Sequence, residues 1–146
     1  MRIRSLMAGI TMGLGLLGGQ AAAQDAAGLD GSIAIELNRL ADAQEGGCSV
    51  YMAITNETSV SLTAFEPDVF IFDTDGIILQ RFRLVSPPVP NGSQRVLLFT
   101  MADQTCDGIG RILLNGVFLC ETSDGPRDDC LDAVAVSSRA EAPLDF

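Results

Sequence analysis

Apolar and polar residues alternate along residues 33–38, with Ile33, Ile35 and Leu37 on one face. This period of two is typical of a strand with one buried face. Similar apolar stretches predict six further strands, at residues 48–55, 69–72, 77–85, 95–101, 112–120 and 131–137. Turn residues separate them, and prolines between residues 87 and 90 interrupt regular pairing before the fifth strand. Only residues 107–112 suit a short helical turn.

Seven short strands in about a hundred residues predict an all-β fold, a single antiparallel β-sandwich. We expect this domain to span residues 32–139, after a flexible segment at residues 24–31. Residues 140–146 form a short C-terminal tail, which can dock through Leu144 and Phe146. The length allows one core and not two.

The first residues of the chain have the order of a secretory signal peptide. Arg2 and Arg4 precede an apolar run over residues 6–17, and three alanines end at Ala23. The run is shorter than the roughly 20 residues of a membrane span, so we expect residues 1–23 to be cleaved. The arginines are not adjacent and no lipid-accepting cysteine follows, which predicts general secretion without later membrane insertion.

Charge and composition limit the compartments and the classes of partner that we expect. The signal peptide takes two of the nine arginines, which leaves seven basic residues against 19 acidic ones, a net charge of −12. Nucleic acid and anionic membrane surfaces are therefore not expected as partners. The chain has no Lys, His or Trp. This bias indicates a GC-rich bacterial genome and the periplasm of a Gram-negative bacterium.

Four cysteines, all in the mature chain, predict two disulfides in an oxidising compartment. Because consecutive strands of a sandwich reverse direction, Cys48 and Cys106 lie at the same end. Cys120 closes the sixth strand and Cys130 opens the seventh, at the other end. We therefore predict the pairs Cys48–Cys106 and Cys120–Cys130. A redox role would need a C-x-x-C pair or a neighbouring Lys or His that lowers a thiol pKa, and the sequence has neither.

Two groups of charged residues are candidate sites. The loop between the last two cysteines carries carboxylates that could offer oxygen ligands to a hard cation, namely Glu121, Asp124, Asp128 and Asp129. We favour a solvated acidic loop, because surface loops are commonly charged, and therefore predict no metal site and no cofactor. Arg81 and Arg83 alternate with apolar residues on the fourth strand, which places two guanidinium groups on one face. That face could receive an acidic partner, or be an ordinary solvated sheet face.

Catalytic chemistry has little support in the sequence. Without His or a free thiol, the common catalytic triads and His-based metal sites are not available. A pair of carboxylates would need a cleft that a small sandwich rarely provides. Asp73-Thr74-Asp75-Gly76 resembles the start of a calcium loop, but apolar residues follow where oxygen ligands belong, so a hairpin turn is expected.

Several motifs resemble known families. The turn Asn56-Glu57-Thr58, the strand at residues 69–73 and Gly76 resemble the signature of FxLYD-like domains, although Val69 stands where that family carries Phe. This resemblance implies an immunoglobulin-like sandwich. The mature chain is also similar to uncharacterised exported proteins of alphaproteobacteria, through Gly47-Cys48, Cys106-Asp107 and residues 111–115. Some of those proteins are named for a Tat signal, which the unpaired arginines here do not match.

Together these features predict a non-catalytic periplasmic binding or adaptor module whose partner is an envelope protein or another envelope component. The alternative is a domain that binds calcium or a small ligand through the acidic loop between Cys120 and Cys130. A carboxylate-based hydrolase is the third interpretation, and it would require a deep pocket lined by unpaired carboxylates.

Overall fold

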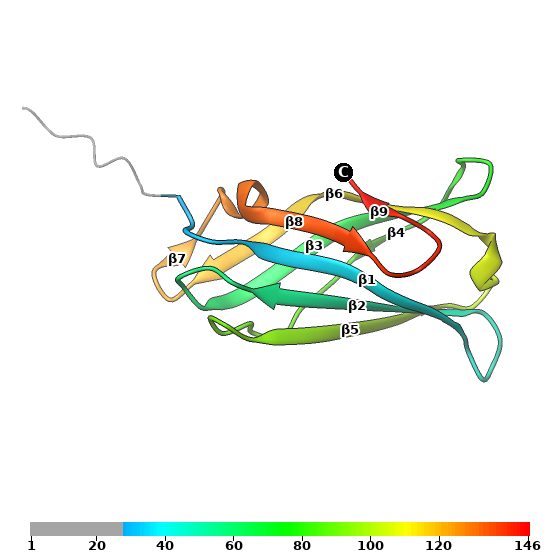
Figure 1. Ribbon diagram of the computed structural model, residues 1–146, viewed down its shortest axis with the longest axis horizontal. Helices are drawn as coiled ribbons and strands as arrows, with labels where there is room; N and C mark the ends of the chain where they lie inside the picture. The colour runs from blue at the N-terminus through cyan, green and yellow to red at the C-terminus, as the bar shows by residue number, and fades with distance from the viewer. Residues whose placement is uncertain (1–27) are drawn as a thin grey trace, which may run out of the picture.

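The computed structural model describes residues 28–146, so the predicted signal peptide lies outside the described residues. Two β-sheets pack against each other (Figure 1). Sheet A has the strand order β5-β2-β1-β8, and sheet B has the order β4-β3-β6-β7, with β9 also paired to β6. The strands are β1 (Ile33–Asp42), β2 (Cys48–Asn56), β3 (Leu62–Asp73), β4 (Ile78–Arg83), β5 (Gln94–Met101), β6 (Ile109–Thr122), β7 (Gly125–Pro126), β8 (Val134–Ser138) and β9 (Leu144–Asp145). Two short 3-10 helices are η1 (Cys106–Gly108) and η2 (Cys130–Ala133).

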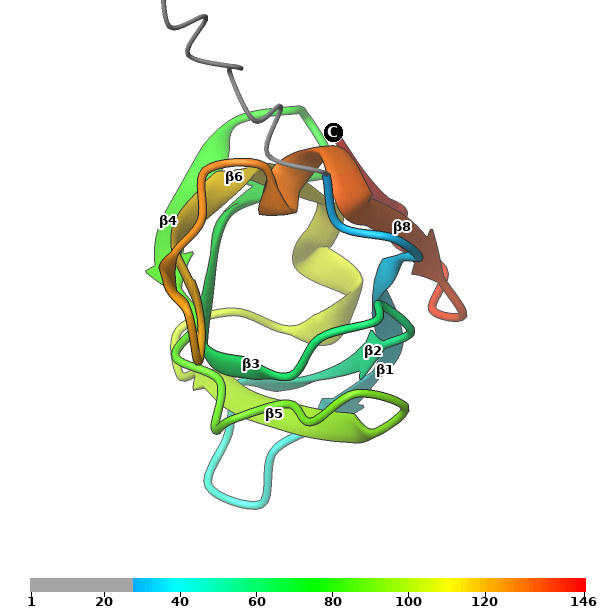
Figure 2. The same ribbon diagram turned by 90° about the vertical axis from the view of Figure 1, so that its left-hand side faces the viewer.

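The predicted all-β sandwich with two disulfides is confirmed, with nine strands in place of seven. The alternation at residues 33–38 marks β1, whose Ile33, Ile35 and Leu37 are fully buried between the sheets. Sheet B faces them with Val69, Ile71 and other apolar residues. Figure 2 looks along the strands and shows the two sheets around this interior.

β3 is longer than the predicted strand because it continues through a proline. The sequence pattern favoured residues 69–72, yet β3 begins at Leu62 and includes Pro67. The missing N–H of Pro67 is tolerated because the ladder to β6 shifts register between Glu66 and Pro67. The carbonyl of Pro67 still accepts a hydrogen bond from the amide of Leu84, which continues the pairing with β4.

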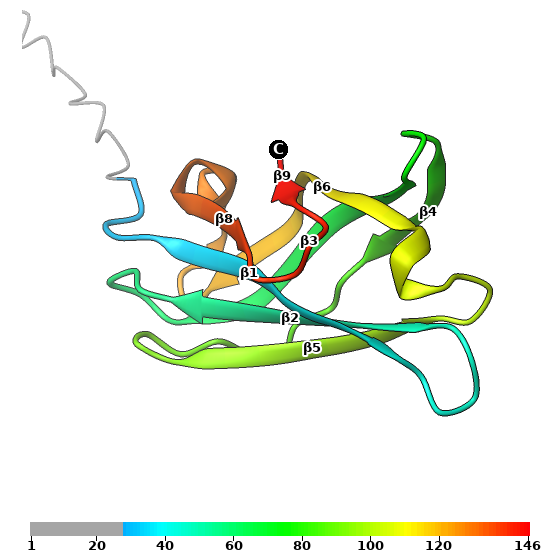
Figure 3. The same cartoon turned by 45° about the vertical axis from the view of Figure 1, so that its right-hand side comes forward.

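The end of the chain departs from a purely antiparallel arrangement. Residues 130–133 form η2, and β8 then pairs in parallel with β1. In a constant-type immunoglobulin domain the last strand lies beside the sixth. Here β7 and β9 pair with β6, so β8 lies in sheet A (Figure 3). Leu144 of β9 is buried, whereas Phe146 remains exposed, so the tail docks through the first of the two expected residues.

Both disulfides pair as the topology predicted. Cys48 at the start of β2 is bonded to Cys106 of η1, with the Cα atoms 4.9 Å apart. Cys120 near the end of β6 is bonded to Cys130 of η2, with the Cα atoms 6.4 Å apart. No cysteine among residues 28–146 is free.

A buried asparagine closes one end of the sandwich. The Asn56 side chain is fully buried, and its amide donates hydrogen bonds to the carbonyls of Val60 and Val89 at 2.8 and 2.9 Å. Its oxygen accepts hydrogen bonds from the backbone amide and the hydroxyl of Thr58 at 3.0 and 2.7 Å. Asn56 therefore joins the turn after β2 to the proline loop before β5.

Candidate partner-binding surface

The outer face of sheet B carries the two arginines that the sequence analysis proposed as a partner face. Arg81 on β4 lies opposite Phe70 on β3, and Arg83 lies opposite Asp68. The neighbouring pair, Phe82 and Val69, points to the interior, where Val69 is fully buried. Because side chains alternate along a strand, Arg81 and Arg83 share the outer face.

The outer face combines guanidinium groups with phenylalanine rings from three strands. Register places Arg111 of β6 opposite Phe72 of β3, although these residues are far apart in sequence. Each of the three arginines lies over a ring: Arg81 over Phe70 at 5.4 Å, Arg111 over Phe72 at 4.5 Å, and Arg83 over Phe118 at 3.1 Å from the ring centroid. We call these six residues the arginine–phenylalanine face. Such stacking holds a guanidinium group in place on the sheet surface.

Arg81 is anchored by a carboxylate within this face. Its Nε and one terminal nitrogen donate to the two carboxylate oxygens of Asp68, at 2.7 and 2.9 Å. The side chain of Asp68 is only 6% exposed and also accepts a hydrogen bond from Asn115. The hydrogen bonds from Arg81 lower the pKa of Asp68 despite its burial, and Asp68 in turn raises the pKa of Arg81. This pair is ionised and nearly neutral as a unit.

Arg83 differs from Arg81 because its charge has no such partner. Within residues 28–146, no carboxylate lies at ion-pair distance from Arg83. Arg111 has Asp145 at 3.8 Å, so the other two arginines of the face each have a nearby carboxylate. Phe118, over which Arg83 lies, is 56% exposed. The face therefore presents, beside an exposed aromatic ring, an arginine that forms no direct ion pair, although its charge also helps to lower the pKa of Asp68, which lies opposite it.

The segment around Arg83 also stands apart in charge from the rest of the chain. Residues 76–102 contain no Asp or Glu, yet they carry three of the seven arginines that follow the signal peptide. They span β4 and β5, which are the edge strands of the two sheets on one side of the sandwich. The segment also holds five of the eight large apolar side chains that are exposed among residues 28–146, namely Ile77, Ile78, Val85, Val96 and Leu98. The absence of acidic residues between Asp75 and Asp103 is visible in the sequence, but strand periodicity alone does not reveal it.

The acidic loop between Cys120 and Cys130 has a different organisation from a cation site. Arg127 forms a two-point ion pair with Asp129, with hydrogen bonds of 2.8 and 2.6 Å. These bonds lower the pKa of Asp129 and raise that of Arg127. Glu121 lies in the β6–β7 ladder, and Asp124 occupies the turn between the two strands. In the described part of the chain, no three Asp, Glu, His or Cys side chains group so as to hold a metal ion.

The turn after β3 closes a hairpin through its own aspartate. The carboxylate of Asp73 accepts hydrogen bonds from the backbone amides of Asp75 and Ile77, at 3.0 and 2.7 Å. This is the side-chain-to-backbone pattern of an Asx turn. Asp73 is thus committed to the turn between β3 and β4, which is the structure that the sequence predicted there.

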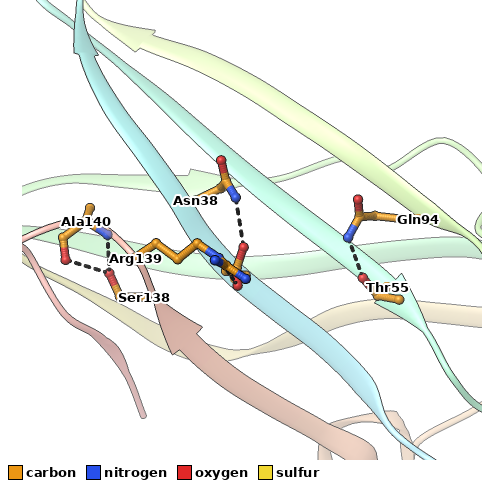
Figure 4. A network of polar contacts seen from close by, with 7 residues as sticks. Asn38, Thr55, Gln94, Ser138, Arg139 and Ala140 are labelled. Carbon is orange, nitrogen blue, oxygen red and sulfur yellow. Dashed lines mark hydrogen bonds and ion pairs between the residues drawn. The ribbon is translucent and has the colours of Figure 1, made fainter.

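A hollow of about 370 Å³ between β1 and the β8–β9 loop is lined by Arg39 and Arg139. Figure 4 includes the polar contacts of two of its lining residues, Asn38 and Arg139, and Arg139 donates to Glu36 at 2.9 Å. Asn38 donates to the same carboxylate, and these two hydrogen bonds lower the pKa of Glu36. The Arg139 charge is therefore paired, and two further acidic residues, Asp107 and Glu141, also line the hollow.

Neither the topology nor the surface can be assigned through a known relative. Comparison with known proteins found no matching family model, no matching curated protein and no matching solved structure. In the part of the chain that the structure describes, no helix is long and apolar enough to cross a membrane.

Proposed function

We propose that this protein is a non-catalytic binding module of the periplasm that recognises an acidic envelope protein through the arginine–phenylalanine face. The observation that carries the proposal is Arg83, an exposed arginine stacked on an exposed ring with no carboxylate at ion-pair distance among residues 28–146. In a mature chain of net charge −12, an unpaired cation on an aromatic surface favours an acidic ligand at that place.

Two independent features support this compartment. Two disulfides stabilise the domain, and disulfides persist in oxidising compartments such as the periplasm. The signal-like sequence at residues 1–23 supplies a route of export.

The residue types of the arginine–phenylalanine face also support a protein partner. Aromatic residues and arginine are the side chains that most often dominate the affinity of protein interfaces.

Photo-crosslinking in the envelope fraction of the encoding bacterium tests this function. The chain has no lysine for amine-directed reagents, so a photoreactive phenylalanine analogue replaces Ile78, which is 55% exposed next to the face. A second protein carries the analogue at Ala135, which is exposed on β8 of sheet A. We expect an acidic protein to be captured from position 78 and not from position 135, with less capture at high salt.

The decisive comparison reverses one charge. Arg83→Glu should reduce capture from position 78 at least fivefold, because it replaces attraction by repulsion. Arg39→Glu is the matched control, since Arg39 is also exposed, lies over the ring of Tyr51 at 5.9 Å and has no ion pair among the described residues. Capture that survives Arg83→Glu unchanged would overturn the proposed function.

A further inference from the structure

β4 presents its backbone, as well as its arginines, to solvent. It pairs with β3 and with no other strand of the described chain. The amides of Leu84 and Ser86 donate to the carbonyls of Pro67 and Phe65 at 2.9 and 3.1 Å, so these residues direct their backbone groups toward β3. In an antiparallel ladder, alternate residues direct theirs to opposite sides. The N–H and C=O groups of Arg81 and Arg83 therefore face the open edge.

A groove follows this edge between the two sheets. It has a volume of about 280 Å³ and is lined by residues of β4 and β5, among them Phe82 and Leu97. Phe82 and Phe99 meet across it with ring centroids 4.4 Å apart, which closes the interior below the groove. An added strand would thus find backbone partners on β4 and an apolar floor between the sheets.

We propose that the acidic partner binds as an extended segment that adds to β4 as an antiparallel strand, with the pattern acidic–apolar–acidic. This inference rests on the proposed function and specifies how the protein recognises the ligand. Residues opposite Arg83 and Arg81 exchange backbone hydrogen bonds with them and place two carboxylates on the outer face. The residue between them lies opposite Phe82 and points to the groove. Backbone pairing supplies affinity, and the alternating side chains supply specificity.

The arginines explain why this open edge is selective. Charged residues on a short edge strand prevent unselective pairing with other strands. A neutral or basic strand would bring no counter-charge to Arg83. A strand with two acidic residues separated by one other residue would place one carboxylate opposite Arg83 and one opposite Arg81. Because Arg81 already binds Asp68, we expect Arg83 to contribute more of the charge recognition.

Labelled peptides test strand addition by fluorescence anisotropy on the mature protein. The probe contains Glu-Val-Glu between threonines, and a permuted probe with Glu-Glu-Val has the same composition but places its carboxylates on opposite faces. We expect the permuted probe to bind at least tenfold more weakly. Methylating the backbone nitrogen of either glutamate should weaken binding about tenfold, because it removes a bond to Arg81 or Arg83. Methylating the valine nitrogen, which points away from β4, should change binding less than twofold.

The outcomes separate this inference from the proposed function. If all acidic peptides bind equally and Arg83→Glu still weakens them, recognition is by charge alone, and strand addition is overturned while the proposed function stands. If no Glu-Val-Glu peptide binds, strand addition is also overturned, and photo-crosslinking decides the proposed function by itself. Pairing with β4 of a second copy would appear as dimerisation without peptide, and that result would equally overturn an acidic segment as the occupant.

Discussion

Replacing Asn56 by alanine tests the buried polar network that fixes the end of the sandwich. Asn56→Ala removes four hydrogen bonds from a fully buried side chain. The Thr58 hydroxyl, released from Asn56, can then donate to the carbonyl of Val60, and the carbonyl of Val89 keeps the Leu62 amide as a donor. The amide of Thr58 loses its partner, which costs about 1–3 kcal/mol for a buried group.

The two lost amide bonds each add about 1 kcal/mol, so the expected loss is about 3–5 kcal/mol. That is a large part of the 5–15 kcal/mol that typically stabilises a domain. Urea unfolding at pH 7 measures the free energy of unfolding, and thermal unfolding should show a fall in Tm of about 10 °C or more. Asn38→Ala is the control, because Asn38 is exposed and its loss should change stability by less than about 0.5 kcal/mol.

Asn56→Asp distinguishes lost bonds from lost volume. The new carboxylate would keep the acceptor for Thr58 but would face the carbonyls of Val60 and Val89. Burial against those oxygens raises its pKa in the folded protein, so the folded state binds the proton more tightly. Stability relative to wild type should therefore fall as pH rises above about 4, whereas the deficit of Asn56→Ala should stay constant. A loss below 1 kcal/mol for alanine, or the same pH profile for both variants, would refute this account of the network.

Three further results are expected. The carboxyl of Asp68 has a lowered folded pKa, so its stabilisation is present above its ordinary value of about 4 and is lost as pH falls through the lowered one. Asp68→Asn should flatten the acid limb of stability measured by urea unfolding between pH 5 and 2, and an unchanged limb would contradict this. Replacing both cysteines of the Cys48–Cys106 pair by alanine should lower the free energy of unfolding by about 4 kcal/mol, and replacing those of Cys120–Cys130 by about 2.7 kcal/mol, because the paired cysteines are 58 and 10 residues apart. A larger loss for the Cys120–Cys130 pair in urea unfolding would contradict this. Millimolar calcium should leave Tm unchanged, since Asp129 is bound to Arg127, and a rise of several degrees would restore the acidic loop as a cation site.

The sequence predicted those features that depend on local pattern and on strand direction. Alternation at Ile33, Ile35 and Leu37 located β1, and strand reversal alone was enough to pair the cysteines. Pro67 hid the first half of β3, because periodicity does not show that a register shift can accommodate a proline inside a strand. The parallel pairing of β8 with β1 could not be predicted either, since it depends on β7 and β9 lying along β6.

The candidate site was predicted only in part for a similar reason. Arg81 and Arg83 were identified because they alternate within a single strand. Arg111 and Phe118 join the face through the register of β6 and its irregularities, which a single strand does not reveal. The lack of acidic residues between Asp75 and Asp103 was visible in the sequence, and its meaning emerged when β4 and β5 proved to be edge strands.

Hydrogen exchange at the backbone amides of Arg81 and Arg83 tests the central claim most directly. NMR would measure both rates in the mature protein with and without a saturating Glu-Val-Glu peptide. Strand addition predicts that both amides, which face the open edge of β4, exchange at least tenfold more slowly with peptide bound, while the amides of β5 do not change. Bound peptide that leaves the exchange of Arg81 and Arg83 unaltered would contradict the account.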